Sequence, residues 1–291
     1  MTGIAQPVRT KPQWAEFPIR IRELQVLRRA LVTDSMVRIT LGGPGIVGFE
    51  SHLPDEHVKL VFPDPDGTTR APVPDGDRLD WPNPFPPTRE YTVRRYDADA
   101  GEVDFDFVVH RGGLASTWAQ GAPIGSSIWV AGPTPPRTVP EECRHLVLLG
   151  DETALPAIGR WLEEMPAGLS GVAAVEIAGA SEEQNLRVPE GFTLHWLHRD
   201  GAPAGHSPLL GEFARTLTLP TNVRSYVWAA GEASTIKPVR RWARAQGVTA
   251  AEYDIGGYWK VGSTRAEPTS VGAKVVNGVR HGWAHLLRRE H

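Results

Sequence analysis

The chain of 291 residues is 41% hydrophobic and 22% charged, which is ordinary globular composition and enough apolar material for a core. A formal net charge of −3 gives no general basic field and excludes wholesale nucleic-acid binding. A single cysteine, Cys143, excludes an internal disulfide framework and a cysteine-rich metal site.

The N-terminus and the apolar runs bear on location. Residues 1–14 contain no apolar segment of the kind found in a signal peptide. No run reaches the ~18 apolar residues that a transmembrane helix needs. We therefore expect no membrane span and a location in the cytoplasm.

The first 138 residues predict an antiparallel β-barrel, because alternating apolar and polar residues form short runs separated by turn residues. The segment 64–87 is rich in proline and aspartate, so no regular structure is predicted there. A short helix opened by glycines is expected at 112–121. The predicted strands are 36–41, 57–63, 88–96, 102–110 and 127–133.

A proline-rich linker at 132–142 is followed by a different pattern. Continuous apolar runs, typical of strands buried on both faces, alternate with helical segments, which predicts βαβ units and a parallel sheet. We therefore divide the chain into a barrel domain (1–138), an α/β domain (139–265) and a basic, amphipathic, helical tail (266–291). The α/β domain has predicted strands at 145–150, 171–179, 192–198, 224–231 and 249–259, and predicted helices at 153–165, 207–217 and 233–247.

The strand at 88–96 raises the first chemical hypothesis. Side chains alternate along a strand, so Arg89 and Tyr91 point together while Thr92 points across. A planar guanidinium suits a diphosphate, an aromatic ring suits a flat ligand, and a hydroxyl suits a ring nitrogen. These are the requirements of a flavin dinucleotide, although such a triplet also occurs by chance in many strands.

Three turns could hold phosphate or ribose groups. Gly112 and Gly113 precede a helix start, and free N–H groups at a helix start are a natural phosphate seat. The turn after the strand at 145–150 has the strand–turn–helix order of a nucleotide site but only Gly150 of the glycine-rich fingerprint. A similar turn follows the strand at 224–231. Each turn alone is commonly just a tight connection.

Taken in order, the motifs REYTVR, HRGGLASTWA, GDETALPAI, WAAGE and YWKVG resemble the siderophore-interacting protein family of ferredoxin-reductase-like flavoproteins. The resemblance runs from about Ile21 to Gly262. It implies an FAD-binding barrel, a nicotinamide-binding α/β domain and a ferric-siderophore reductase. In such an enzyme NAD(P)H gives a hydride to FAD, which reduces siderophore-bound iron(III) by single electrons and releases iron(II). Family members often carry proline where this chain has Leu114.

The resemblance also implies the site residues. Tyr91 and Thr92 are the expected catalytic residues, and Lys59 and Lys260 are expected to hold an anionic ferric siderophore. From charge alone, Arg94 or Arg95 could join these lysines. No metal site is expected, because no His, Asp or Glu cluster has metal-ligand spacing. The expected cofactor contacts are Arg89, Tyr91, Thr92, Val109, His110, Gly113, Ala115, Ser116 and Thr117 for FAD, with Asp151, Thr153, Ala154, Gly231 and Glu232 for the nicotinamide nucleotide.

The electron donor is open between NADH and NADPH. Glu182 and Glu183 follow the second α/β strand and would suit a ribose hydroxyl, which favours NADH. Basic residues on a nearby predicted helix, Lys237, Arg240 and Arg241, would favour NADPH. Two other functions also stay open: a flavin reductase module that exchanges electrons with a ferredoxin, for which the basic tail would be the docking element, and a non-catalytic siderophore carrier.

Overall fold

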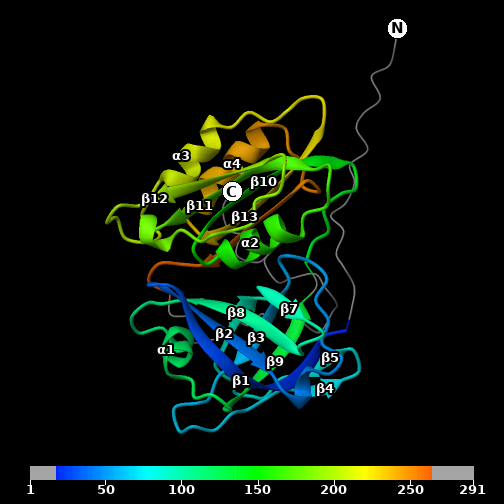
Figure 1. Cartoon of the computed structure of the whole chain (residues 1–291), viewed down its shortest axis with the longest axis vertical. Helices are drawn as coiled ribbons and strands as arrows, with labels where there is room; N and C mark the ends of the chain where they lie inside the picture. Colours follow the sequence, from blue (N-terminus) through cyan, green and yellow to red (C-terminus); the bar gives the residue numbers. More distant parts are fainter. Residues whose placement is uncertain (1–17, 135, 264–291) are drawn as a thin grey trace.

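The computed structural model describes residues 18–134 and 136–263. Figure 1 shows two bodies stacked along the long axis, with antiparallel strands below and a sheet flanked by helices above. The chain passes from one body to the other between β9 and β10, the interval that contains the proposed domain boundary at 138/139. The tail proposed at 266–291 lies outside the described residues.

Seven antiparallel strands form the barrel. Their order is β6-β3-β9-β1-β2-β8-β7, so the two edges of the sheet are β6 and β7. Only Val93 and Arg94 separate these edge strands in the chain, and the Arg94 N–H donates to the carbonyl of Asp104 on β8 at 2.9 Å. The edges therefore meet, and the predicted barrel is confirmed. The strands are β1 (Arg20–Thr33), β2 (Met36–Gly42), β3 (His57–Val61), β6 (Thr88–Thr92), β7 (Arg95–Asp97), β8 (Glu102–Val108) and β9 (Ser127–Thr134).

Two strands differ from the sequence prediction. The strand predicted at 88–96 is interrupted at Val93 and Arg94, where the chain passes from one sheet edge to the other. The strand β1 is 14 residues long and is absent from the prediction. Only Leu24 and Val26 of β1 are fully buried, half of its 14 residues are polar, and its apolar residues keep no alternation along the whole strand.

The prediction of no regular structure in 64–87 is wrong. Within this segment β4 (Val73–Asp75) and β5 (Arg78–Asp80) pair as an antiparallel hairpin. The hairpin turns at Gly76, whose φ of 60° is readily adopted only by glycine. The proline- and aspartate-rich composition of this segment therefore did not indicate the turn that the backbone of Gly76 allows. Two short 3-10 helices, η1 (Pro44–Ile46) and η2 (Ala180–Glu182), complete the irregular segments.

The upper body is a five-stranded parallel sheet, as predicted, and its strand order is β12-β11-β10-β13-β14. Helix α2 packs on the face toward the barrel, while α3 and α4 pack on the opposite face (Figure 1). The strand order reverses between β10 and β13, and ligands of such sheets bind at the carboxyl ends of the strands near this point. The elements are β10 (Cys143–Asp151), α2 (Leu155–Glu164), β11 (Ser170–Ile177), β12 (Phe192–His198), α3 (Leu209–Thr216), β13 (Arg224–Glu232), α4 (Ile236–Ala245) and β14 (Tyr253–Trp259).

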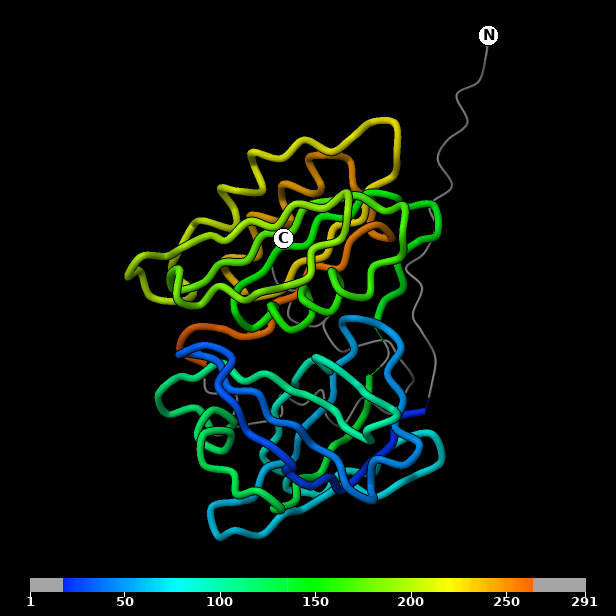
Figure 2. Tube along the Cα trace, in the orientation of Figure 1, coloured from blue at the N-terminus to red at the C-terminus, as the bar shows by residue number. Residues whose placement is uncertain are grey.

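The two bodies meet in a seam of polar contacts on the α2 side of the sheet. Arg94 of the barrel makes a two-pronged ion pair with Glu163 of α2, both distances being 2.7 Å. Arg160 of α2 donates to the Ser51 hydroxyl at 2.8 Å. Figure 2 shows the segment after β14, drawn in orange, between the two bodies. The seam therefore brings the barrel close to the carboxyl end of β14.

Candidate active site at the seam

The ring of Tyr91 forms an aromatic platform on β6. It packs against Phe107 with a centroid distance of 4.1 Å, and Phe107 in turn contacts Trp118 of α1 (Leu114–Gly121). Tyr91 is only half-buried, so the barrel core supports one side of its ring while part of the ring stays exposed to solvent. Burial raises the pKa of its hydroxyl, which keeps the ring neutral. The neighbouring Arg89 is also half-buried and donates to the Thr88 carbonyl at 2.7 Å.

Thr92 connects the barrel to the parallel sheet. It is buried and shares a side-chain hydrogen bond with Tyr258 of β14. Burial raises the pKa of Tyr258, and the edge of this ring lies against Trp228 with a centroid distance of 6.3 Å. Tyr258 is a site residue that the sequence reasoning missed, although it stands in the YWKVG motif. Thr92 and Tyr258 thus set the position of the carboxyl end of β14 over β6.

The start of α1 offers backbone donors. Its N-cap, Gly113, carries no side-chain cap, so the first-turn N–H groups, including that of Ala115, point out of the helix end. A Cβ at Gly113 would lie 2.2 Å from Cε1 of His110, so the imidazole lies directly against bare backbone. Leu114 occupies the first helical position, where proline also fits, so the departure from the family pattern leaves the start of the helix intact.

The remaining residues predicted around this helix start have structural contacts. The Ser116 hydroxyl accepts the His110 N–H at 2.9 Å, and the Val109 N–H donates to the Ser35 carbonyl at 2.8 Å. The Thr117 N–H donates to the Gly113 carbonyl at 2.8 Å and closes the first helical turn, while its side chain is exposed. These bonds hold the helix start beside β8.

Asp151 joins three loops at the carboxyl edge of the sheet. Its Oδ1 accepts the N–H and hydroxyl of Thr153 at 2.9 and 2.6 Å, and its Oδ2 accepts the Glu232 N–H and the Trp259 indole N–H, both at 2.8 Å. Burial raises the pKa of this carboxyl, and hydrogen bonds oppose that rise. Gly231 is the penultimate residue of β13, and a Cβ there would lie 2.8 Å from Oδ2, so the carboxyl end of this strand needs glycine. Asp151 therefore positions the turns, with both oxygens committed to the protein.

The start of α2 lies directly after the turn that follows β10. Ala154 is its N-cap and no side chain caps the helix. Unlike the start of α1, this helix start offers few donors, because Pro156 has no N–H and the Ala157 and Ile158 N–H groups both donate to the Ala154 carbonyl, at 3.1 and 3.0 Å.

Glu232 closes the start of α4. Its Oε2 accepts the N–H groups of Ser234 and Thr235 and the Ser234 hydroxyl, and its Oε1 accepts the Val261 N–H at 3.2 Å. Burial would raise the pKa of Glu232, but these hydrogen bonds outweigh burial and hold that pKa below its ordinary value. The ionised carboxylate therefore occupies the place at the helix start that a phosphate would otherwise take.

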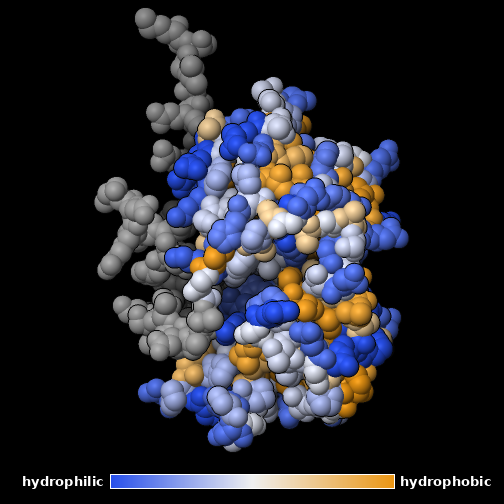
Figure 3. Space-filling view, turned by 90° about the vertical axis from the view of Figure 1, so that its left-hand side faces the viewer, coloured by the Kyte–Doolittle hydropathy of each residue, from blue (hydrophilic) through white to orange (hydrophobic). Residues whose placement is uncertain are grey.

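The two predicted substrate lysines reach the seam from opposite bodies. Lys59 on β3 pairs across the strand with Glu90 of β6 at 2.5 Å, two residues before Thr92. Lys260 is exposed and follows β14, two residues after Tyr258. Lys260 therefore lies two residues from one end of the Thr92–Tyr258 hydrogen bond, and Glu90, the cross-strand partner of Lys59, lies two residues from the other end. Figure 3 shows a recess with hydrophilic residues at mid-height between the two bodies.

Arg94 and Arg95 do not join these lysines. Arg94 is buried against Glu163, and Arg95 pairs with Asp104 at 2.7 Å and with Asp97 at 2.9 Å. Their charges are used inside the protein, so the idea that they attract a substrate anion is wrong.

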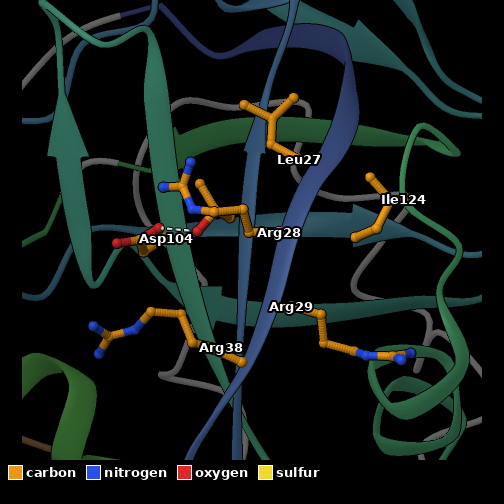
Figure 4. Close-up of a pocket in the computed structure, with 8 residues that line it drawn as sticks. Leu27, Arg28, Arg29, Arg38, Asp104 and Ile124 are labelled. Atoms are coloured by element: carbon orange, nitrogen blue, oxygen red, sulfur yellow. Dashed lines mark hydrogen bonds between the residues drawn. The ribbon is translucent and has the colours of Figure 1, made fainter.

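A separate pocket of about 470 Å³ lies on the outer face of the barrel (Figure 4). It is lined by Leu27 and Ile124 together with three arginines. Arg28 pairs with Glu102 at 2.5 Å, Arg38 pairs with Asp106 at 2.6 Å, and Arg29 donates to a backbone carbonyl. None of its lining residues comes from β6 or from the start of α1. Arg28 and Arg38 thus form cross-strand ion pairs, and the pocket is not part of the candidate site.

No group of three or more His, Cys, Asp or Glu side chains is arranged to hold a metal ion within residues 18–134 and 136–263. Within the same ranges no helix combines the length and the apolar character needed to cross a membrane.

An antiparallel barrel followed by a parallel nucleotide-binding sheet is the ferredoxin-reductase fold. The ferredoxin reductase of carbazole 1,9a-dioxygenase shares it with a TM-score of 0.62 at 13% identity, over 84% of this chain and 71% of that chain. Residues 25–137 match the family model for the siderophore-interacting FAD-binding domain, and residues 143–262 match the model for siderophore-interacting proteins. The chain belongs to the siderophore-interacting protein family.

Similar proteins come from several bacteria. The ferric vibriobactin reductase ViuB of Vibrio cholerae is 33% identical over 83% of this chain and 90% of that protein. An NADPH-dependent ferric-chelate reductase of Escherichia coli is 32% identical over 85% of this chain and 96% of that protein. The crystal structure of a siderophore utilization protein from T. fusca has a TM-score of 0.81 at 41% identity and covers 87% of this chain and 98% of its own.

The described residues fit an FAD at the seam. The uncapped start of α1 offers N–H donors to phosphate, and the fixed, half-open ring of Tyr91 offers a surface to a flat ring system. The His110 imidazole lies against the bare backbone of Gly113 and therefore borders this helix start. The start of α1 and the ring of Tyr91 each match one chemical part of the flavin dinucleotide.

Proposed function

We propose that this protein is an FAD-dependent ferric-siderophore reductase that takes electrons from NADH or NADPH. The hydrogen bond between Thr92 and Tyr258 carries the proposal, because it joins the strand expected to hold the flavin to the edge expected to hold the nicotinamide. Relatives that are named ferric reductases and that this chain matches over most of their length support the same reaction. The cytoplasm is the proposed location.

The barrel residues are proposed to bind and orient the flavin. Arg89 and the first-turn N–H groups of α1 hold the diphosphate, Tyr91 supports the ring system, and Thr92 offers its hydroxyl to a ring nitrogen. FAD, when bound, accepts a hydride and passes electrons on singly, which suits a two-electron donor and a one-electron acceptor. Tyr258 fixes the Thr92 hydroxyl and closes the seam from the sheet side.

The sheet residues are proposed to orient the nicotinamide nucleotide. Asp151 holds the turns after β10 and β13 together, so that a nucleotide lying across Gly231 meets backbone rather than side chains. Thr153 and Ala154 place the start of α2 at the same edge. The protein's part is therefore orientation, and no side chain needs to gain or lose a proton for hydride transfer.

The ferric siderophore is proposed to bind in the seam between Lys59 and Lys260. Iron remains bound by its chelator throughout, so the protein needs positive charge rather than metal ligands. Because Lys59 is already paired with Glu90, Lys260 is the stronger attractor of an anion. A ferredoxin as electron partner and a siderophore carrier without turnover are the alternatives.

Anaerobic reduction of the holoprotein tests this function. The purified protein should be yellow, NADH or NADPH should bleach it, and ferric siderophores should restore the colour while an iron(II) trap develops its own. A colourless protein that binds ferric siderophore without turnover would instead indicate a carrier. Bleaching by reduced ferredoxin but not by either nucleotide would indicate the ferredoxin-linked alternative.

Replacing Lys260 by alanine is expected to raise the apparent KM for an anionic ferric siderophore about 3- to 10-fold. The Lys59→Ala change should have a smaller effect, because Glu90 already neutralises that charge. Steady-state kinetics at low and high salt measure this, and salt should shrink both effects. Arg78→Ala, which removes an exposed charge from β5, is the control. Unchanged chelate kinetics in the double variant would remove both lysines from the site.

A further inference from the structure

A pocket of about 380 Å³ lies at the carboxyl edge of the parallel sheet, between the starts of α3 and α4. Three hydroxyl side chains line it: Ser207 before α3, and Ser234 and Thr235 before α4. It adjoins the turn after β13, where the proposed function places the nicotinamide nucleotide. The far end of that nucleotide is an adenosine whose ribose carries either a free 2′-hydroxyl or a 2′-phosphate.

The hydrogen-bond donors at the start of α4 are already used. The Ser234 and Thr235 N–H groups both donate to Oε2 of Glu232, at 2.5 and 3.1 Å, and so does the Ser234 hydroxyl. The Thr235 hydroxyl donates to the Glu232 carbonyl at 3.1 Å. A phosphate at this helix start would have to displace a buried carboxylate. The Ser234 and Thr235 oxygens thus present lone pairs rather than hydrogens to a ligand.

The hydrogen-bond donors at the start of α3 are also already used within the protein. The Leu209 N–H donates to the Ser207 hydroxyl oxygen at 3.2 Å, and the Ser207 hydroxyl itself donates to the Glu176 carboxylate. All three lining hydroxyls therefore donate within the protein. What they can still accept is a hydrogen from a ligand O–H group, which a ribose diol supplies and a phosphate dianion does not.

Acidic groups outnumber basic ones beneath the pocket, but burial raises the pKa of Glu176 to about 7, so this carboxyl is only partly ionised near neutral pH. Glu176 is the penultimate residue of β11, the second strand of the sheet, where a carboxylate in other nucleotide-binding folds recognises ribose hydroxyls. It is 1% exposed, and its Oε2 has no partner among the described residues. Arg199 lies between Glu152 and Glu176, 3.7 Å from the latter, so two carboxylates neutralise its charge. A 2′-phosphate would bring further negative charge over this cluster.

We propose that this pocket binds the adenosine ribose with its 2′-hydroxyl free, so that the enzyme uses NADH in preference to NADPH. This inference rests on the proposed function, and it differs from the donor in the name of the similar Escherichia coli protein. His206 and Arg215 also line the pocket and are exposed. They can meet the 5′-diphosphate, which both nucleotides share. Glu176 and Glu232 do not line the pocket themselves; they act on the ribose through the serine hydroxyls whose hydrogen bonds they accept, those of Ser207 and Ser234.

Glu182 and Glu183 do not make this selection. Glu182 accepts a hydrogen bond from Thr33 of the barrel at 2.5 Å, and Glu183 contacts His198 at 2.8 Å. Both acids are thus engaged within the protein, and the preference for NADH rests on other acids. Of the basic residues that argued for NADPH, Arg240 donates to the Ile255 carbonyl.

Equilibrium binding of NAD⁺ and NADP⁺ to the FAD-loaded protein tests the inference, because the two differ only in the 2′-phosphate. We expect NAD⁺ to bind at least about tenfold more tightly, and the kcat/KM for flavin bleaching to favour NADH by a similar factor. Equal or tighter binding of NADP⁺, or binding of neither nucleotide, would overturn the inference. If NAD⁺ binds selectively but neither reduced form bleaches the flavin, the proposed function fails while the inference stands.

Substitutions of the two acids test whether they determine the preference for NAD⁺ over NADP⁺. Glu176→Gln keeps the shape of the side chain and removes its charge, and it should narrow the NAD⁺-to-NADP⁺ affinity ratio at least about threefold. Glu232→Gln should act in the same direction. The control is Glu142→Gln, which removes an exposed carboxylate paired with Arg224 just before β10, at the opposite edge of the sheet. A ratio that both pocket variants leave unchanged would remove these acids from the selection.

Discussion

Replacing Asp55 by asparagine is expected to stabilise the protein by about 2–4 kcal/mol near pH 8, and by progressively less as the pH falls toward about 4. Asp55 is buried in the seam, where burial and the nearby Asp254 raise the pKa of its carboxyl from 3.8 to about 7. Its Oδ2 accepts the Trp228 indole N–H at 3.0 Å, while its Oδ1 has no partner among the described residues.

The direction of the effect follows from proton linkage. A carboxyl whose pKa is higher in the folded than in the unfolded state contributes stability below its unfolded pKa, and that stability is lost as the pH rises through the folded value. For Asp55 the loss falls between the ordinary 3.8 and about 7. Asparagine cannot ionise, and its carbonyl oxygen can still accept the Trp228 N–H, so this loss should disappear.

Urea unfolding at about pH 5 and about pH 8 measures the effect. The free energy of unfolding of Asp55→Asn should exceed that of the wild type by more at the higher pH. Asp75→Asn, an exposed change on β4, should follow the wild type at both values. A constant offset between Asp55→Asn and the wild type would show that Asp55 does not titrate in this range.

Strong periodic signals made the layout of the chain predictable. The apolar runs of β10 and β13 and the helices between them were assigned from sequence, because strands buried on both faces need unbroken apolar residues. β1 escaped prediction, since one end of it is exposed and its burial is irregular. The hairpin at Gly76 is the opposite kind of error. The composition of segment 64–87 argues against regular structure, yet one residue with a positive φ allows a hairpin turn there.

The polar pairs of the seam could not be predicted, because they depend on how two bodies pack. Asp55 and Trp228 are separated by 173 positions in the chain, and no local pattern links them. The same holds for Arg94, which sequence placed near the substrate and packing placed against Glu163. Asp151 and Gly231 were found through the resemblance, yet their joint role in holding two turns together needs the structure.

Replacing Asp151 by alanine is expected to lower kcat/KM for the nicotinamide nucleotide at least about 100-fold. Four hydrogen bonds from Thr153, Glu232 and Trp259 end on this one carboxylate. Without it these donors lose their acceptor at a cost of about 1–3 kcal/mol for each one left buried, so the melting temperature should fall by about 5 °C or more. The turns after β10 and β13 would no longer be held in register where the nucleotide is proposed to lie.

The barrel residues proposed to hold FAD make none of these four bonds, so the Asp151→Ala variant should separate the two halves of the reaction. FAD occupancy should match the wild type, and enzyme reduced chemically by dithionite should still reduce a ferric siderophore at the normal rate. Glu183→Ala, which removes an exposed acid from the same sheet domain, should change neither half. Loss of FAD together with loss of nucleotide turnover would mean that Asp151 supports the seam as a whole. Intact nucleotide kinetics would mean that the turns keep their geometry without it.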